Sequence, residues 1–276
     1  MVSRITGMVA SFGGALIGSS ATPRGWPSWA IYLRTMGLFC LLWYTVSWLT
    51  PNKLLLPSPL DVAAAMRDRL EDGELIANAT VSLTRLLISV ALASLLAIPL
   101  GLAMGARRPV EDLLEWPVEL LRPIAGIAWI PLALFMFGIG NGLPIFIMVY
   151  TAFFPLLLGT AAGVRNVDRR LIAAAKTMGL SNGRLMHHVI LPAALPSIMT
   201  SLRLAVAASW TAVVAAELVG APSGLGYAIE YYRSMLDTPS VMTFIIVIGA
   251  LGFLCDTALR WLSTAVMPWA QSEERR

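Results

Sequence analysis

Long apolar segments separated by short polar ones make up most of this chain. About 20 apolar residues in a helix cross a bilayer core of about 30 Å, and six segments approach or reach that length. They are residues 35–49 (extended at the start by 29–33), 82–104, 111–137, 143–164, 198–219 and 241–262. This pattern predicts an all-α, polytopic membrane protein with about six transmembrane helices.

Prolines and glycines divide these segments further. Pro51 is predicted to end the first span, because proline lacks the amide hydrogen that continues a helix. Pro123 is predicted to break the third segment, and Gly220–Tyr227 predicts a turn or re-entrant stretch after the fifth. Between the first two spans, apolar residues four positions apart predict a short amphipathic surface helix: Val62, Met66 and Leu70.

The segment 167–196 is the longest basic interruption of the apolar pattern. Within it, Asp168–Met178 is predicted to be a helix with one face formed by Leu171, Ala174, Ala175 and Met178. Gly179 suits the left-handed position that ends a helix, and Ser181 is predicted to cap a second helix over Asn182–Val189. The pairs Leu191-Pro192 and Leu195-Pro196 are predicted to stop that helix and turn the chain back into the membrane.

Two interpretations of this loop stay open on the residues alone. Small side chains at the bend would let the surface of another protein come close. The basic side chains would equally suit an anchor to anionic membrane lipid. They are Arg169, Arg170, Lys176 and Arg184, accompanied by His187 and His188.

Composition and charge support a membrane location. The chain of 276 residues is 57% hydrophobic and 13% charged, whereas a soluble domain carries about 25% charged residues. The net charge of +4 therefore says little about nucleic acid, and no nucleic-acid partner is predicted. With the N-terminus inside, eleven Arg and Lys residues face the cytoplasm and four face outward. The positive-inside rule then places both termini and the basic loop in the cytoplasm.

The predicted organisation has four parts. Residues 1–28 form a cytoplasmic or interfacial leader, although Arg4 followed by a mildly apolar run also allows a signal peptide. Residues 29–80 hold the first transmembrane helix and a periplasmic amphipathic segment. Residues 81–270 form the main transmembrane domain, and 271–276 form a cytoplasmic tail.

Catalytic chemistry is weakly represented. Cys40 and Cys255 lie apart within apolar runs, so no metal site is predicted, and no catalytic residue is assigned. A phosphate-binding loop places a lysine after a glycine. The only lysines, Lys53 and Lys176, follow Asn52 and Ala175, so ATP hydrolysis would have to come from another chain. A membrane-embedded enzyme is disfavoured because the sequence offers no group of metal-binding or nucleophilic residues.

A translocation path would use polar side chains within the spans. Hydrogen-bond donors without excess fixed charge suit an anion that must be released as well as bound; the candidates are Trp129, Tyr150, Ser209, Trp210 and Thr211. Glu217 follows thirteen uncharged residues, and charge within a span is costly. It is either a hydrogen-bonded structural residue near the outer face or a gate or dimer-contact residue.

Several motifs resemble those of one transporter family. The loop spacing Ala174-Ala175, three residues, Gly179, nine residues, Val189, one residue, Leu191-Pro192 resembles the EAA loop of bacterial ABC importer permeases. The wider pattern resembles the nitrate, sulfonate, taurine and bicarbonate branch of that family, and it covers about Ser82 to Trp269. It consists of Leu121-Arg122-Pro123, residues 128–132, Phe137-Gly138-Ile139-Gly140, Leu195-Pro196, residues 202–204, Trp210, residues 216–218, residues 224–227 and Pro268-Trp269. Two departures stand out: Ala173 replaces the motif glutamate, and Ala125-Gly126 stand where relatives often have two prolines.

The resemblance implies a multi-pass permease of the bacterial inner membrane that works as a homodimer. It implies two partner ATPases, which bind ATP and Mg, and a periplasmic solute-binding protein. The loop would dock to the ATPase through Ala173, Ala174, Ala175, Lys176, Thr177, Met178, Gly179, Leu180, Arg184, Leu191 and Pro192. The implied solute is a small anion of the alkanesulfonate or taurine, nitrate or bicarbonate class. A pyrimidine or aromatic solute is the alternative within the family, and an ion-coupled secondary transporter is the alternative outside it.

Overall fold

The computed structural model describes residues 28–50, 54 and 56–267, with the side chains of 28–33 excepted. All regular elements among these residues are helical, so the predicted all-α class is confirmed. The chain divides into two compact units, Met1–Lys53 and Leu54–Arg276. The first unit contributes α2 (Ser28–Leu49), which coincides with the predicted first span. Residues 1–27 of the predicted leader, the tail and Pro268-Trp269 lie outside the described residues, and residue 28 begins α2.

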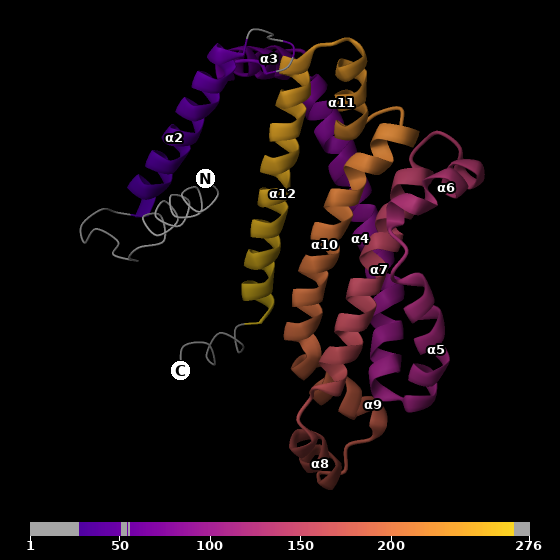
Figure 1. Cartoon of the computed structure of the whole chain (residues 1–276). Coiled ribbons are helices and arrows are strands. Elements are labelled where there is room, and N and C mark those ends of the chain that lie inside the picture. The colour runs from indigo at the N-terminus through magenta and orange to yellow at the C-terminus, as the bar shows by residue number, and fades with distance from the viewer. Residues whose placement is uncertain (1–27, 51–53, 55, 268–276) are drawn as a thin grey trace, which may run out of the picture. The chain divides into compact units, whose positions relative to one another are not determined.

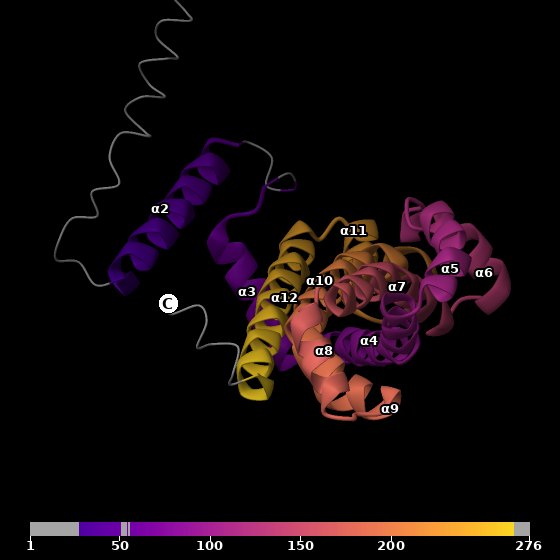
Figure 2. The ribbon, with the colours of Figure 1, turned by 90° about the horizontal axis from the view of Figure 1, so that it is seen from below.

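Four long helices form the second unit (Figure 1). They are α4 (Glu74–Ala106), α7 (Gly142–Arg165), α10 (Leu191–Gly220) and α12 (Thr238–Val266). Each lies in a helix long and apolar enough to cross a membrane, and α10 does so together with the short elements before it. Figure 2 shows α4, α7 and α10 side by side in the view along the bundle. Outward side chains of the long helices, such as Leu95 of α4 and Phe253 of α12, are exposed and apolar, as lipid contact requires.

The third predicted span is broken, as the proline pattern predicts. Helix α5 (Arg108–Leu121) ends just before Pro123, and the 3₁₀ turn η1 (Gly126–Trp129) leads into α6 (Ile130–Phe137). The two parts are bent by 81°. Counting this pair as one span gives five candidate spans in the described part of the chain, and α2 is the remaining predicted one.

Short helices close the two ends of the bundle (Figure 1). The predicted amphipathic helix is α3 (Pro59–Glu71), and it lies at one end with α11 (Leu225–Ser234). At the opposite end lie α8 (Arg169–Thr177) and α9 (Asn182–Leu185). We refer to these as the α11 end and the α8 end.

Glycines spaced four apart bring the central helices into contact. A Cβ added to Gly101 or Gly105 of α4 would lie 2.7 Å or less from atoms of α7, including the Leu157 carbonyl oxygen and the Val164 side chain. On the other side of α7, a Cβ on Gly163 would lie 2.7 Å from Ser197 Cβ of α10. Small residues at this spacing let membrane helices pack backbone to backbone. The three helices therefore form a single tight layer around α7.

We predict that Gly163→Leu lowers the free energy of unfolding by about 1–3 kcal/mol, because the added side chain must force α7 and α10 apart. The measurement is the thermal unfolding midpoint of the detergent-solubilised protein. Gly249→Leu is the matched control, since Gly249 also lies in a long helix but has no atom within 4 Å of an added Cβ. Equal midpoints for the two variants would contradict the close-packed layer.

Candidate functional site

The basic loop forms a compact helical hairpin at the α8 end. Asp168 caps α8 by accepting a hydrogen bond from the Arg170 amide at 2.8 Å. At the other end of α8, Gly179 has a φ of +77°, which confirms the predicted left-handed cap. The amide of Leu180 donates to the Ala175 carbonyl and that of Gly179 to the Lys176 carbonyl, at 3.2 and 3.0 Å. This pairing is the Schellman motif, which fixes the bend between α8 and α9.

The second helix of the loop differs from its prediction. Ser181 occupies the N-terminal position of α9, but its side chain makes no capping hydrogen bond and instead accepts one from Arg184 Nε at 3.3 Å. Helix α9 passes through the π-helical turn η2 (Met186–Ile190) directly into α10.

The prediction that Leu191-Pro192 and Leu195-Pro196 stop this helix is therefore wrong. Residues 182–220 form one continuous apolar helix of 39 residues. Pro192 directly follows the π turn, where the regular α-helical hydrogen-bond pattern is already interrupted. Pro196 is accommodated inside the helix, as prolines often are in membrane helices.

Helix α8 presents two different faces. On the outward face, Leu171 and Met178 are 53% and 79% exposed, and Ala174 is exposed beside them. On the inward side, Ala175 is buried in an apolar cluster with Leu185 and Ile190. The prediction that Ala175 shares one face with Leu171, Ala174 and Met178 and belongs to the docking surface is therefore wrong, because its small side chain packs against the bundle. Apolar side chains exposed on a surface helix indicate an interaction site.

The other predicted docking residues are distributed over the hairpin, and one of them, Lys176, lines the cavity on its inner side. Ala173, Lys176, Thr177 and Arg184 are exposed, so the position of the missing motif glutamate lies on the surface. Leu180, Leu191 and Pro192 are half-buried where the hairpin meets the bundle. The structure thus brings these residues together at one end of the molecule.

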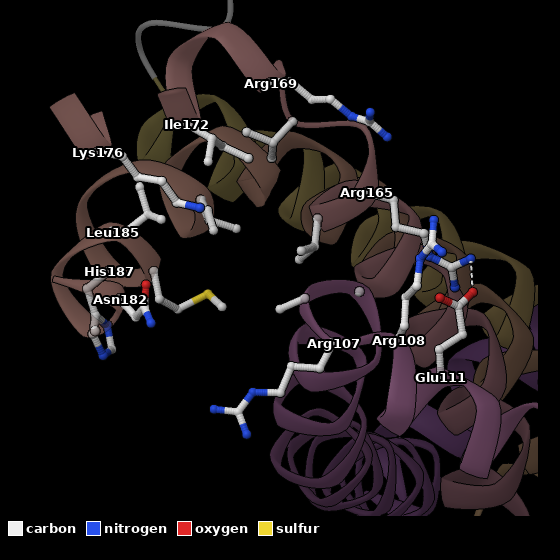
Figure 3. A pocket seen from close by; sticks show the side chains of 17 residues that line it. Arg107, Arg108, Glu111, Arg165, Arg169, Ile172, Lys176, Asn182, Leu185 and His187 are labelled. Carbon is white, nitrogen blue, oxygen red and sulfur yellow. Dashed lines mark ion pairs between the residues drawn. The ribbon is translucent and has the colours of Figure 1, made fainter. Parts of the chain in front are cut away.

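A basic cavity of about 920 Å³ lies on the inner side of the hairpin (Figure 3). Its walls come from the α4–α5 junction, the end of α7, α8, α9 and η2. Glu111 is paired with Arg165 at 2.5 Å across one side of it. In Figure 3 Arg107 and Lys176 extend from opposite walls. The Arg107-Arg108 pair after the second apolar segment was the sequence signal that could have indicated this cavity.

A buried ion pair organises the α11 end. The Arg85 guanidinium of α4 donates to the Glu217 carboxylate of α10 at 2.7 Å, and both side chains are at most 3% exposed. Ser82 donates to the same carboxylate at 2.8 Å, and the Gly226 amide donates to it at 2.9 Å. Arg85 also donates to the Asn141 side chain and to the Ser223 carbonyl, at 2.6 and 2.7 Å. Glu217 therefore has the bonds of a structural residue, and its role as a gate stays a prediction.

Glycines make room for this carboxylate. Gly224 has a φ of +114°, and a Cβ added there would collide with the Glu217 carboxyl group. A Cβ on Gly226 would lie 2.7 Å from the Cβ of Glu217. The predicted glycine turn is thus the wall of the ion-pair site, since no larger residue could approach the carboxylate so closely.

A second polar contact joins α11 to α4 at the same end. The Tyr232 hydroxyl donates to Glu74, and the Arg69 guanidinium lies 4.6 Å from the centre of the Tyr232 ring. Burial raises the pKa of the Tyr232 hydroxyl above its usual value, and the hydrogen bond to Glu74 raises it further. Tyr232 therefore stays protonated and serves as a donor.

The path candidates lie in two places. Ser209 and Trp210 are buried, and their side chains donate to carbonyls of neighbouring helices, Met148 at 2.9 Å and Ile248 at 3.1 Å. Thr211 is exposed and donates to the Ala208 carbonyl of its own helix. Their part in a path remains a prediction.

Trp129 and Tyr150 lie together at the break of the third span. Their rings are 5.6 Å apart, and the Tyr150 hydroxyl donates to the Leu121 carbonyl at 2.6 Å. The Trp129 indole nitrogen is buried and has no hydrogen-bond partner among the described residues. Tyr150 also lines a cavity of about 500 Å³ with Arg122, an exposed cation.

Comparison with known proteins identifies this architecture as that of a transporter membrane subunit. A membrane subunit in a structure titled "Inward facing conformations of the MetNI methionine ABC transporter" matches with a TM-score of 0.64 at 19% identity, covering 71% of this chain and 97% of that one. The chain belongs to the family described as binding-protein-dependent transport system inner membrane component, whose model matches residues 97–268.

Two relatives extend the match over most of the chain. The taurine transport system permease protein TauC of Escherichia coli is 35% identical over 243 residues, which is 86% of this chain and 88% of TauC. The bicarbonate transport system permease protein CmpB of Synechococcus elongatus is 30% identical over 269 residues, which is 90% of this chain and 96% of CmpB. The suspected family is thereby confirmed.

The ion pair gives a double-variant prediction. Arg85→Met or Glu217→Leu alone should lower the free energy of unfolding by about 3–5 kcal/mol, because each leaves a buried charge without its partner. Combining the two should recover part of that loss. The measurement is the thermal unfolding midpoint of the solubilised protein.

Arg203 and Asp256 provide the comparison pair for this experiment. They join α10 to α12 at 2.9 Å, and about one-third of each side chain is exposed. Arg203→Met should therefore lower the free energy of unfolding less than Arg85→Met does. A double variant less stable than both single variants would contradict the coupling of Arg85 and Glu217.

Proposed function

We propose that this chain is the permease subunit of an ATP-driven importer that moves a small anion across the bacterial inner membrane. Two copies form the path, each copy binds one ATPase, and a periplasmic binding protein delivers the solute to the α11 end. ATP and Mg belong to the ATPases. The α8 end and both termini face the cytoplasm, in agreement with the positive-inside distribution.

The exposed apolar face of α8 carries this proposal. Leu171, Ala174 and Met178 lie at the tip of a hairpin whose inner side is locked into the bundle by Ala175 and Leu185. A partner that grips this face therefore moves the hairpin as a unit. The continuous helix 182–220 then conveys the movement to Glu217 and the ion pair at the opposite end.

The solute class is supported by the relatives and by the cavity at the broken span. TauC and CmpB are named for the transport of taurine and of bicarbonate. Taurine and bicarbonate each have a compact anionic group. Arg122 supplies one fixed positive charge next to the aromatic wall formed by Tyr150 and Phe154. One cation attracts an anion without holding it too tightly for release. We infer that sulfonates such as taurine are the preferred solutes.

The docking face predicts a specific loss of function. Met178→Glu places a charge in an apolar contact without disturbing the fold, so it should lower both the co-purifying ATPase and the ATP-dependent uptake at least about tenfold. Uptake of labelled taurine and of bicarbonate is measured in proteoliposomes that contain the whole complex. Met235→Glu, at an exposed methionine of the α11 end, is the control. Full ATPase recovery with Met178→Glu would refute the docking face.

Gly179 tests the geometry of the bend independently. Gly179→Trp should uncouple transport from ATP hydrolysis, because its φ of +77° strains any side chain and a bulky ring intrudes on the proposed contact. Gly179→Asn should retain more coupling than Gly179→Val, since asparagine tolerates the left-handed conformation. The ratio of solute moved to ATP hydrolysed is the readout, and equal ratios in all three variants would exclude a role for this bend.

A further inference from the structure

The basic cavity at the α8 end has more positive charge than its own residues neutralise. Five Arg and Lys side chains line it, with one carboxylate. That carboxylate, Glu111, is engaged by Arg165. The remaining four have no ion pair among the described residues: Arg107, Arg108, Arg169 and Lys176. Like charges gathered around one cavity repel each other and attract an anion.

We propose that this cavity binds a phosphate group, carried by an anionic phospholipid or by a soluble phosphate compound. Arginine matches phosphate because its planar fork donates two parallel hydrogen bonds, and Lys176 adds a mobile point charge. A volume of about 920 Å³ accommodates a phosphate ester with its attached group. Arg107 and Lys176 line the cavity from different elements, the α4–α5 junction and α8, and Figure 3 shows their side chains on different walls.

The position of the cavity suits a lipid headgroup. It opens where the apolar helices α4 and α7 end, at Ala106 and Arg165, and the polar headgroup region lies at that level of a bilayer. Basic pockets between helix ends on the cytoplasmic side bind anionic headgroups in membrane proteins. On α5, Leu113 and Trp116 are exposed one and two turns beyond Arg108, where acyl chains would run.

Helix α8 separates this cavity from the docking face. Arg169, Ile172 and Lys176 recur three and four residues apart and line the cavity, whereas Leu171, Ala174 and Met178 lie on the outward side. A bound phosphate therefore ties α8 to the α4–α5 junction and leaves the outward face free. Binding itself does not depend on the proposed function; only its effect on coupling does.

The experiment compares two double variants of the full-length chain in detergent. Arg107→Gln/Lys176→Gln removes two charges from the cavity. Arg170→Gln/Arg184→Gln removes two charges from exposed loop residues that do not line it. The first probe is phospholipid retained after reconstitution in equal phosphatidylglycerol and phosphatidylcholine, counted by mass spectrometry. The second probe is the shift of the unfolding midpoint with inorganic phosphate at constant ionic strength.

The wild type and the loop variant should retain phosphatidylglycerol over phosphatidylcholine, and the cavity variant should retain about tenfold less of it. The ligand would instead be a soluble phosphate compound if inorganic phosphate raises the unfolding midpoint but no phosphatidylglycerol is retained. In that case only the cavity variant should lose the rise in midpoint. If the cavity variant matches the loop variant with both probes, the proposal is overturned. Arg108→Gln replaces the cavity variant if that variant lacks the wild-type helical content by circular dichroism.

This outcome is independent of the docking experiment. Met178 does not line the cavity, so the Met178→Glu substitution leaves the proposed phosphate contacts unchanged. If the wild-type protein binds the ATPase but neither the phospholipid nor inorganic phosphate, the phosphate site alone is refuted. Phosphate binding that persists while Met178→Glu has no effect would refute the docking face alone.

Discussion

The ion pair between Arg85 and Glu217 is the interaction on which the arrangement of the α11 end depends. Two charges removed from water are tolerated only when every remaining hydrogen-bonding position is filled. Here the partners come from α4, α10, the turn before α7 and the glycine turn before α11. The pair therefore fixes four segments in one geometry. Without it, the glycine turn at Gly224 would have no carboxylate to enclose.

At the α8 end the chain uses backbone conformation for the same purpose. The Schellman motif at Gly179 sets the angle of α8, and the apolar cluster around Ala175 and Leu185 holds the hairpin against the bundle. One end of the molecule is thus fixed by charge and the other by a turn and apolar packing. The close-packed layer of α4, α7 and α10 joins them, because its glycines leave little space for sliding.

Local signals predicted much of this structure. The apolar lengths indicated the long helices, Pro123 indicated the broken span, and Gly179 indicated the left-handed cap, since each depends on residues next to it. Contacts between distant residues were not accessible in this way. Glu217 was singled out as a charge in a span, but its partner lies 132 positions away, and the pattern alone does not choose among the other charges.

The helix after Gly179 shows how a correct rule can fail. Prolines at 192 and 196 were expected to stop a helix, and in an isolated peptide they would do so. In the structure a π turn comes before the first proline, and the surrounding helices hold the chain in line. The glycines at 101, 105 and 163 were visible in the sequence, but their role in packing depends on which helices become neighbours.

The continuous helix of 39 residues has a mechanical consequence. At 1.5 Å per residue it is about 58 Å long. A tilt of about 10° about the middle of the helix would displace both ends by about 5 Å in opposite directions, which is comparable to the width of a small solute. A displacement of the hairpin by less than one helical turn is thus matched by an equal and opposite displacement at the α11 end, with the layer of α4, α7 and α10 tilting as one body and no segment unfolding.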